Sequence, residues 1–174
     1  MTSETKRPRR AWIWFFFLLG LLTTSGIVWE VWFNQQQQLT PEALAAARRQ
    51  WDEYGPCDYR LEYNIKRESN PDMAGPAPER YEVEIRDGRV RSATDSGGHS
   101  LQPGQYQFGS MESLFDFIRD TLAADANPDR PRAFVKASFD EKDGHVSNYV
   151  HSVTRTRERL EVTVKLVPEP DRRD

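Results

Sequence analysis

Residues 80–90 read RYEVEIRDGRV, and this stretch decides the fold. Its apolar residues alternate with charged ones, and successive side chains of a β-strand point to opposite faces of the sheet. The alternation therefore predicts a half-buried strand. Asp87-Gly88 is a strong signal for a two-residue hairpin turn, after which Val90 begins a return strand. The stretch as a whole predicts an antiparallel sheet with one apolar and one polar face.

The same period-two pattern recurs elsewhere in the chain and predicts further strands. The segments are residues 59–66, 133–139, 146–150 and 160–166. Within the third segment we expect Val146, Asn148 and Val150 to share one face. Asp143-Gly144 repeats the hairpin signal, so the strands on either side of it are expected to pair antiparallel.

Two segments change to helical spacing. Thr40-Pro41-Glu42 is typical of a helix start, with Thr as the cap and Pro in the first turn, and Gly55-Pro56 ends that helix. A second helix begins after Ser110. Their apolar stripes are Leu44, Ala47, Trp51 and Tyr54 in the first, and Met111, Leu114, Phe115, Ile118 and Leu122 in the second. We predict an α+β domain ordered helix, three strands, helix, three strands, with both helices packed on one face of an antiparallel sheet.

An apolar run precedes the domain. Residues 11–33 contain one charged residue, Glu30, and meet the roughly 20 residues that a spanning helix needs. The apolar character continues past the only cluster of small residues, Thr23 to Gly26, which favours an uncleaved signal-anchor over a cleavable signal peptide. Cleavage is the alternative.

Basic residues precede this run and none follows it closely. Lys6, Arg7, Arg9 and Arg10 therefore predict a single-pass protein of the cell membrane with a cytoplasmic N-terminus. The predicted division is a cytoplasmic flank (1–10), a transmembrane anchor (11–33), a Gln-rich linker (34–38), an extracytoplasmic domain (39–167) and a charged tail (168–174).

Composition narrows the function. The net charge of −3 lacks the basic excess expected of a nucleic-acid-binding protein, so nucleic acid is not a predicted partner. The membrane is a predicted partner because of the apolar run at 11–33. Cys57 is the only cysteine, which rules out an internal disulfide. We expect a buried, unreactive thiol there.

No catalytic residue, metal site or cofactor is predicted. His99, His145 and His151 have neither the spacing of a helical metal site nor a neighbouring cysteine. Residues 140–144, DEKDG, resemble the start of a calcium loop, but Lys142 occupies a ligand position, so we interpret them as a charged hairpin.

The loop over residues 96–109 is the most site-like part of the chain. Its glycines and polar side chains are typical of functional loops, and we select His99, Tyr106 and Phe108 as candidate interaction residues. Gly97–Ser100 is the alternative place for an enzyme site. A plain connecting loop, in which the two aromatic residues close the edge of the core, also fits.

Several core and turn residues form a familiar pattern. They are Trp51, Gly55-Pro56, Asp58-Tyr59-Arg60, Val83, Asp87-Gly88-Arg89-Val90, Leu114-Phe115, Ile118, Phe139-Asp140 and Gly144. Between Ala43 and Val167 the chain resembles the bacterial domain-of-unknown-function family six-one-seven-four. The resemblance implies a membrane-anchored or secreted envelope protein and no catalytic residues. Some members carry Cys-x-Cys in the first strand, where this chain has Ile65, Lys66 and Arg67.

Three functions remain open from the sequence. The first is a membrane-anchored envelope domain that binds another envelope protein or a ligand without catalysis. The second is an enzyme with its site near Gly97–Ser100, and the third is a passive structural or assembly component. An exposed apolar patch would favour the first, and converging titratable groups the second.

Overall fold

The computed structural model describes residues 38–68, 77–154, 156 and 158–168. From Gln38 onward the chain forms one compact unit. The predicted anchor at 11–33 lies outside the described residues, as do the cytoplasmic flank and most of the charged tail. Within the residues described, no helix is long and apolar enough to cross a membrane.

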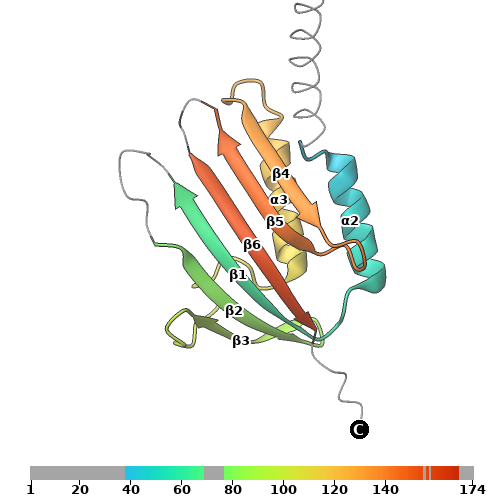
Figure 1. The fold of residues 1–174 in the computed structure, drawn as a ribbon, viewed down its shortest axis with the longest axis vertical. Coiled ribbons are helices and arrows are strands. Elements are labelled where there is room, and N and C mark those ends of the chain that lie inside the picture. The colour runs from blue at the N-terminus through green and yellow to red at the C-terminus, as the bar shows by residue number, and fades with distance from the viewer. Residues whose placement is uncertain (1–37, 69–76, 155, 157, 169–174) are drawn as a thin grey trace, which may run out of the picture. The chain divides into compact units, whose positions relative to one another are not determined.

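The domain is a six-stranded antiparallel sheet with two helices (Figure 1). The elements are α2 (Pro41–Tyr54), β1 (Tyr59–Glu68), β2 (Glu79–Arg86), β3 (Arg89–Asp95), α3 (Met111–Asp125), β4 (Ala133–Phe139), β5 (Val146–Val153) and β6 (Arg159–Pro168). This is the α+β class and the element order predicted from the sequence.

The strand order is β3-β2-β1-β6-β5-β4, so the first and last strands pair at the centre of the sheet. Their register runs from Tyr59 opposite Pro168 to Glu68 opposite Arg159. The arrangement leaves β3 and β4 at opposite edges. The chain between these two edge strands must therefore cross the sheet, and it does so through the loop before α3 and through α3 itself.

Both helices cover the same face of the sheet. Directly opposed residues in a sheet share a face, and the register places Tyr59 and Tyr149 on one face through the chain of pairs across β6. The α2 residue Trp51 packs edge-on against Tyr59, with ring centroids 5.3 Å apart. The α3 residue Phe117 packs against Tyr149 at 6.0 Å. The predicted one-sided packing is therefore confirmed.

A line of aromatic rings runs through the core from β2 to β5. Successive ring centroids lie 5.1, 5.3, 5.3 and 6.0 Å apart, and the rings are those of Tyr81, Tyr63, Phe108, Phe117 and Tyr149. Phe108 belongs to the loop before α3 and is 1% exposed. The loop thus completes the core where the helices do not reach.

The opposite face of the sheet is charged. Glu62 lies within 3.2 Å of the Arg80 guanidinium and 3.8 Å of Lys165, and Arg60 pairs with Glu82 at 3.2 Å. Exposed pairs of this kind contribute about 0–1 kcal/mol each. The charged residues that alternate with apolar ones in the sequence therefore form this solvated face of the sheet.

The helix starts and the end of α2 at Gly55 follow the sequence closely, whereas the burial of one predicted core residue does not. The Ala43 N–H donates to Thr40 Oγ1 at 3.2 Å, and Ser110 and Ser113 form a reciprocal capping box at the start of α3. Tyr54, which we expected in the apolar stripe of α2, is 61% exposed. The prediction is wrong because the last buried position of α2 is Trp51, one turn earlier.

The two hairpin signals behave differently. Asp87 and Gly88 both have positive φ and join β2 to β3 directly, as predicted. Asp143-Gly144 does not form a two-residue turn, because the connection between β4 and β5 spans residues 140–145. Gly144 has φ +76°, and a Cβ there would lie 2.4 Å from the Ala47 carbonyl oxygen. The glycine therefore serves the close contact between this connection and α2.

A β-bulge changes which side chains of β5 are buried. The register of β4 with β5 shifts between Ser138 and Phe139. As a result Val146 is fully buried, whereas Val150 pairs with Glu161 on the charged face. The expectation that Val146, Asn148 and Val150 share a face is wrong, because a bulge shifts the alternation by one residue.

Three buried tyrosines give a matched test of the core. The Tyr63 hydroxyl accepts the Phe108 N–H at 3.1 Å and the Tyr59 hydroxyl accepts the Met111 N–H at 3.0 Å. Among the described residues the Tyr149 hydroxyl has no hydrogen-bond partner. We predict that Tyr63→Phe and Tyr59→Phe each lower the free energy of unfolding by about 1–3 kcal/mol, because each leaves a buried N–H unpaired.

Tyr149→Phe is the control and should leave stability unchanged or raised, because it removes an unpaired hydroxyl. Urea unfolding of the full chain in detergent micelles, followed by Trp fluorescence, would measure all three variants. Equal losses for the three substitutions would contradict the assigned hydrogen bonds.

Candidate functional site: an apolar groove between the two helices

One side of α2 faces α3 across an open hollow. The α2 residues that line it are Pro41, Leu44, Ala45 and Arg48. They are spaced at three, four and seven positions, so they form one stripe along the helix. Leu44 is 5% exposed and forms part of the floor, whereas Ala45 is exposed on the wall.

The facing side of α3 contributes a matching stripe. Its lining residues are Phe115, Arg119, Leu122, Ala123 and Ala126, which also recur at helical spacing. The two stripes enclose a volume of about 620 Å³. We call this hollow the α2–α3 groove, and its size lies within the range of about 300–1,000 Å³ typical of ligand pockets.

Small residues keep the groove open. Ala45, Ala123 and Ala126 stand exposed beside the buried Leu44 and Phe115. Packed helices normally interdigitate their side-chain ridges, but alanines at these positions supply no ridge. The groove therefore has an apolar floor and low apolar walls.

The charged residues that line the groove are both arginines. The Arg48 and Arg119 guanidiniums lie 2.6 and 2.9 Å from the same Asp116 oxygen. The hydrogen bond from Arg48 is the main reason that the pKa of the Asp116 carboxyl is lowered. Asp116 thus bridges α2 to α3 at one end of the groove. Asp120 also pairs with Arg119, at 3.0 Å, so the two guanidiniums are offset by two carboxylates.

A polar cleft lies at the other end of α2, around Glu112. The cleft has a volume of about 770 Å³ and includes Trp51, Tyr59 and Glu112 in its lining. The Trp51 Nε1–H donates to Glu112 Oε1 at 2.8 Å, and the Tyr59 hydroxyl lies 3.5 Å from Oε2. Desolvation raises the pKa of the Glu112 carboxyl, but hydrogen bonds from Trp51, Ser110 and Tyr59 outweigh it, so the net pKa is lowered.

Cys57 lines the same cleft and is exposed. The expectation of a buried thiol is wrong, because Cys57 lies in the turn between α2 and β1, before the alternating burial of the strand begins. The buried positions start two residues later, at Tyr59.

The predicted interaction loop does not form one surface. The His99 side chain is 79% exposed and pairs with Asp95 at 3.1 Å. Tyr106 is partly buried against the core, and Phe108 is 1% exposed. Phe108 therefore lies in the core, where its N–H donates to the Tyr63 hydroxyl and its ring packs against the Tyr63 ring.

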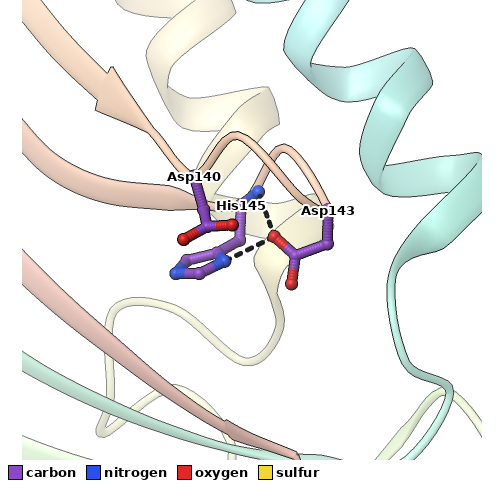
Figure 2. A group of neighbouring side chains, drawn as sticks. All are labelled: Asp140, Asp143 and His145. Atoms are coloured by element: carbon purple, nitrogen blue, oxygen red, sulfur yellow. Dashed lines mark hydrogen bonds and ion pairs between the residues drawn. The ribbon is translucent and has the colours of Figure 1, made fainter.

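Each histidine pairs with a different aspartate. Besides the Asp95–His99 pair, His151 Nε2 lies 2.9 Å from Asp125, and His145 Nδ1 lies 2.6 Å from Asp143. Figure 2 shows the backbone N–H and the ring nitrogen of His145 directed at the same Asp143 oxygen. In the part of the chain that the structure describes, the three pairs lie apart: Asp95–His99 and Asp143–His145 are each within one connection, and Asp125–His151 joins the end of α3 to β5.

Asp140, Asp143 and His145 offer three donor atoms within 4.8 Å of one another (Figure 2). The carboxylates already accept hydrogen bonds within the connection, from the Lys142 N–H to Asp140 and from His145 to Asp143. Gln50 of α2 donates to the Glu141 carbonyl at 2.6 Å. These contacts shape the β4–β5 connection and fasten it to α2.

Comparison with known proteins adds one match. The model of a family of unknown function, DUF6174, matches residues 43–149, from α2 to the first half of β5. The chain belongs to this family. No curated protein and no solved structure matches the chain. The family resemblance seen in the sequence is thereby confirmed.

Sequence reasoning missed the α2–α3 groove. The helical stripes chosen for the core contain Leu44, Phe115 and Leu122, which also line the groove. The missed residues are the alanines one position away on each helix. In the sequence these alanines appear as small residues beside each core stripe. Such residues are compatible both with two closely packed helices and with an open groove, so the pattern alone does not distinguish the two.

Glu112 predicts a pH-dependent contribution to stability. Because its pKa is lowered in the folded state, its contribution is fully present above the unfolded-state pKa of about 4.3 and is lost as the pH falls through the lower folded value. We predict that Glu112→Gln is less stable than the wild type near neutral pH and that the gap narrows below about pH 4.3. Urea unfolding at several pH values would measure the gap.

Glu42→Gln is the matched control, because Glu42 is also an exposed acid in the first turn of its helix but lies outside the contacts that Glu112 makes with Trp51 and Tyr59. It reports the general effect of removing a carboxylate from the first turn of a helix. A gap for Glu112→Gln that stays constant down to about pH 3 would contradict the assigned hydrogen bonds.

Proposed function

We propose that this chain is a single-pass, membrane-anchored protein of the bacterial envelope whose extracytoplasmic domain is a non-catalytic binding module. The anchor part rests on the apolar run at 11–33 and on the basic residues before it. The binding part rests on the domain.

The α2–α3 groove is the observation that carries the binding part. An open apolar hollow with a few fixed polar groups is the usual form of a ligand or partner site. Here the floor is Leu44 and Phe115, and the fixed polar groups are Arg48 and Arg119. The helical layer thus offers an apolar contact surface bordered by two arginines, which are paired with Asp116 and Asp120.

The arrangement of titratable groups favours binding over catalysis. Acid–base and nucleophilic chemistry need groups that converge on one reacting atom. In the described domain His99 bonds to Asp95 on an exposed loop, and His145 and His151 bond to their own aspartates elsewhere. These pairs support a structural role for each histidine: His99 and His145 each stabilise their own connection, and His151 joins β5 to the end of α3.

The first prediction under this proposal concerns topology. An alkaline phosphatase fused after Gln38 should be active, because the reporter folds only outside the cytoplasm, whereas a fusion after Arg10 should be inactive. Reporter activity after expression in a bacterium is the measurement. An inactive fusion after Gln38, together with an active cytoplasmic reporter at the same position, would overturn the membrane topology.

The second prediction concerns occupancy of the groove in native membranes. A photo-crosslinking amino acid placed at Ala45 should form an adduct, because Ala45 lines the groove. The same residue at Ala46 is the control, because Ala46 is equally exposed on the same helix but lies outside the lining. Mass spectrometry of the purified chain would detect the adduct, and equal labelling at both positions would contradict a binding role for the groove.

A further inference from the structure

We infer that Asp140, Asp143 and His145 bind a zinc ion in the connection between β4 and β5. This inference goes beyond the proposed function and does not depend on it, because the three residues lie outside the α2–α3 groove. Three features of the connection lead to this metal: the convergence of its donor atoms, the rigidity of its backbone and the chemistry of the donor set.

The donor atoms converge from both ends of the connection. Asp140 directly follows β4, and His145 directly precedes β5. One ligand atom from each of the three side chains lies within 4.8 Å of the other two. Figure 2 shows both carboxylates beside the imidazole ring, with its Nδ1 directed at Asp143. The three side chains therefore share one small volume.

The spacing of these atoms requires only small side-chain movements. Zinc bonds of about 2.0–2.2 Å in a tetrahedral arrangement place the ligand atoms about 3.3–3.6 Å apart. The His145 Nδ1 lies 2.6 Å from Asp143 Oδ1, so this pair has to separate by about 1 Å. Wider gaps, of up to 4.8 Å, have to close by at most about 1.5 Å. Rotation of the three side chains covers these changes while the backbone stays in place.

The backbone of the connection is already fixed. The Asp140 N–H donates to the His145 carbonyl at 2.9 Å, and the Gly144 N–H donates to the Asp140 carbonyl at 3.0 Å. Gln50 of α2 donates to the Glu141 carbonyl at 2.6 Å. None of these bonds uses a side-chain atom of the three ligands. Because the ligands are held in place beforehand, little conformational entropy is lost when an ion binds.

The hydrogen bonds of the two carboxylates are compatible with a metal. The Lys142 and His145 N–H groups donate to Oδ1 of Asp140 and of Asp143. An ionised carboxylate has about four lone-pair sites, so it can accept an N–H and still bind an ion. Such bonds orient metal ligands. The contact that changes is the one between His145 Nδ1 and Asp143, because Nδ1 releases its proton to solvent and the metal takes its place.

The local charge favours a dication. The side chains of Asp143 and His145 are 18% and 14% exposed, so these groups have lost much of their water. A proton on the imidazole offsets one of the two carboxylates, whereas a divalent ion offsets both. The helix that packs on this connection does not compete, because α2 meets its glycine with three uncharged residues, Ala47, Gln50 and Trp51.

The donor set selects zinc among the common divalent ions. Calcium takes six to eight oxygen ligands, and magnesium demands octahedral oxygen coordination. An imidazole nitrogen with two carboxylate oxygens instead suits zinc, with water in the fourth position. Lys142, which breaks the calcium pattern in the sequence, is exposed and contributes its backbone N–H rather than a ligand.

The test uses the full chain in detergent micelles after treatment with a chelator and dialysis. Co²⁺ replaces zinc as the probe, because its visible absorption reports tetrahedral coordination. We expect one Co²⁺ per chain with a tetrahedral spectrum, displaced by Zn²⁺ and not by the same concentration of Mg²⁺ or Ca²⁺. Absence of the tetrahedral spectrum, or displacement by Ca²⁺ as effective as that by Zn²⁺, would overturn the zinc site.

Matched variants locate the ion. His145→Gln and Asp143→Asn should each weaken Zn²⁺ binding at least about tenfold, because even the loss of a residue that only supports a ligand costs about 10–100-fold. His99→Gln is the control, because His99 pairs with Asp95 but no third donor completes a group there within the described residues. Cys57→Ser tests the thiol and should bind as tightly as the wild type. Circular dichroism checks that each variant is folded.

A measurement on the unmodified chain supplements the variants. X-ray absorption of its zinc complex should show nitrogen and oxygen ligands at about 2.0–2.2 Å, with the signature of one imidazole. A sulfur ligand at about 2.3 Å would assign the ion to Cys57 and overturn the inference. Zinc affinity that is unchanged in His145→Gln, or lowered equally in His99→Gln, would also overturn it. These outcomes leave the proposed binding function as it stands, because the α2–α3 groove contains none of the residues tested.

Discussion

Two tyrosine hydroxyls on the central strand β1 determine where α3 begins. Tyr59 and Tyr63 accept the backbone N–H groups of Met111 and Phe108, at a point where the chain has to cross from one sheet edge to the other. These N–H groups are buried and would otherwise have no acceptor, so their pairing is obligatory and not incidental. Glu112 adds a third link through Trp51 and thereby ties α2 to the same point. The relative placement of the helices, and with it the α2–α3 groove, depends on these contacts.

The sequence predicted what depends on local periodicity. The alternation in residues 59–66 and 80–90, the cap at Thr40 and the turn at Asp87-Gly88 are local signals, and the structure contains the strands, helix and hairpin that they predict. The errors arise where a tertiary contact overrides the local pattern. Gly144 looks like a hairpin residue but allows a close approach to α2, and Val146 is buried because a bulge shifts the register.

The candidate site was less accessible to sequence reasoning for the same reason. A groove between helices is defined by what is missing between two surfaces, and no motif marks the missing volume. Ala45 and Ala123 are ordinary helix formers in isolation and line a groove only once α2 and α3 lie side by side. We predicted His99, Tyr106 and Phe108 as interaction residues because loops often carry function. Phe108, however, is buried in the core. Nothing in the sequence marked Arg48 and Arg119 as neighbours, because their shared partner Asp116 brings them together only in the folded domain.

The pairing of β1 with β6 has a consequence for how the domain folds while the chain is being synthesised. These strands come from opposite ends of the domain and form the centre of the sheet, so the inner strands cannot close until the final strand is available. Contacts between distant parts of a chain slow folding. A chain that emerges from its N-terminus first can pair β1 with β2 early, but the edge of β1 that pairs with β6 stays open until nearly all of the chain has been made. During that interval the nascent domain is a natural client for a holding chaperone, and a truncation that removes β6 would leave the centre of the sheet open and prone to aggregate.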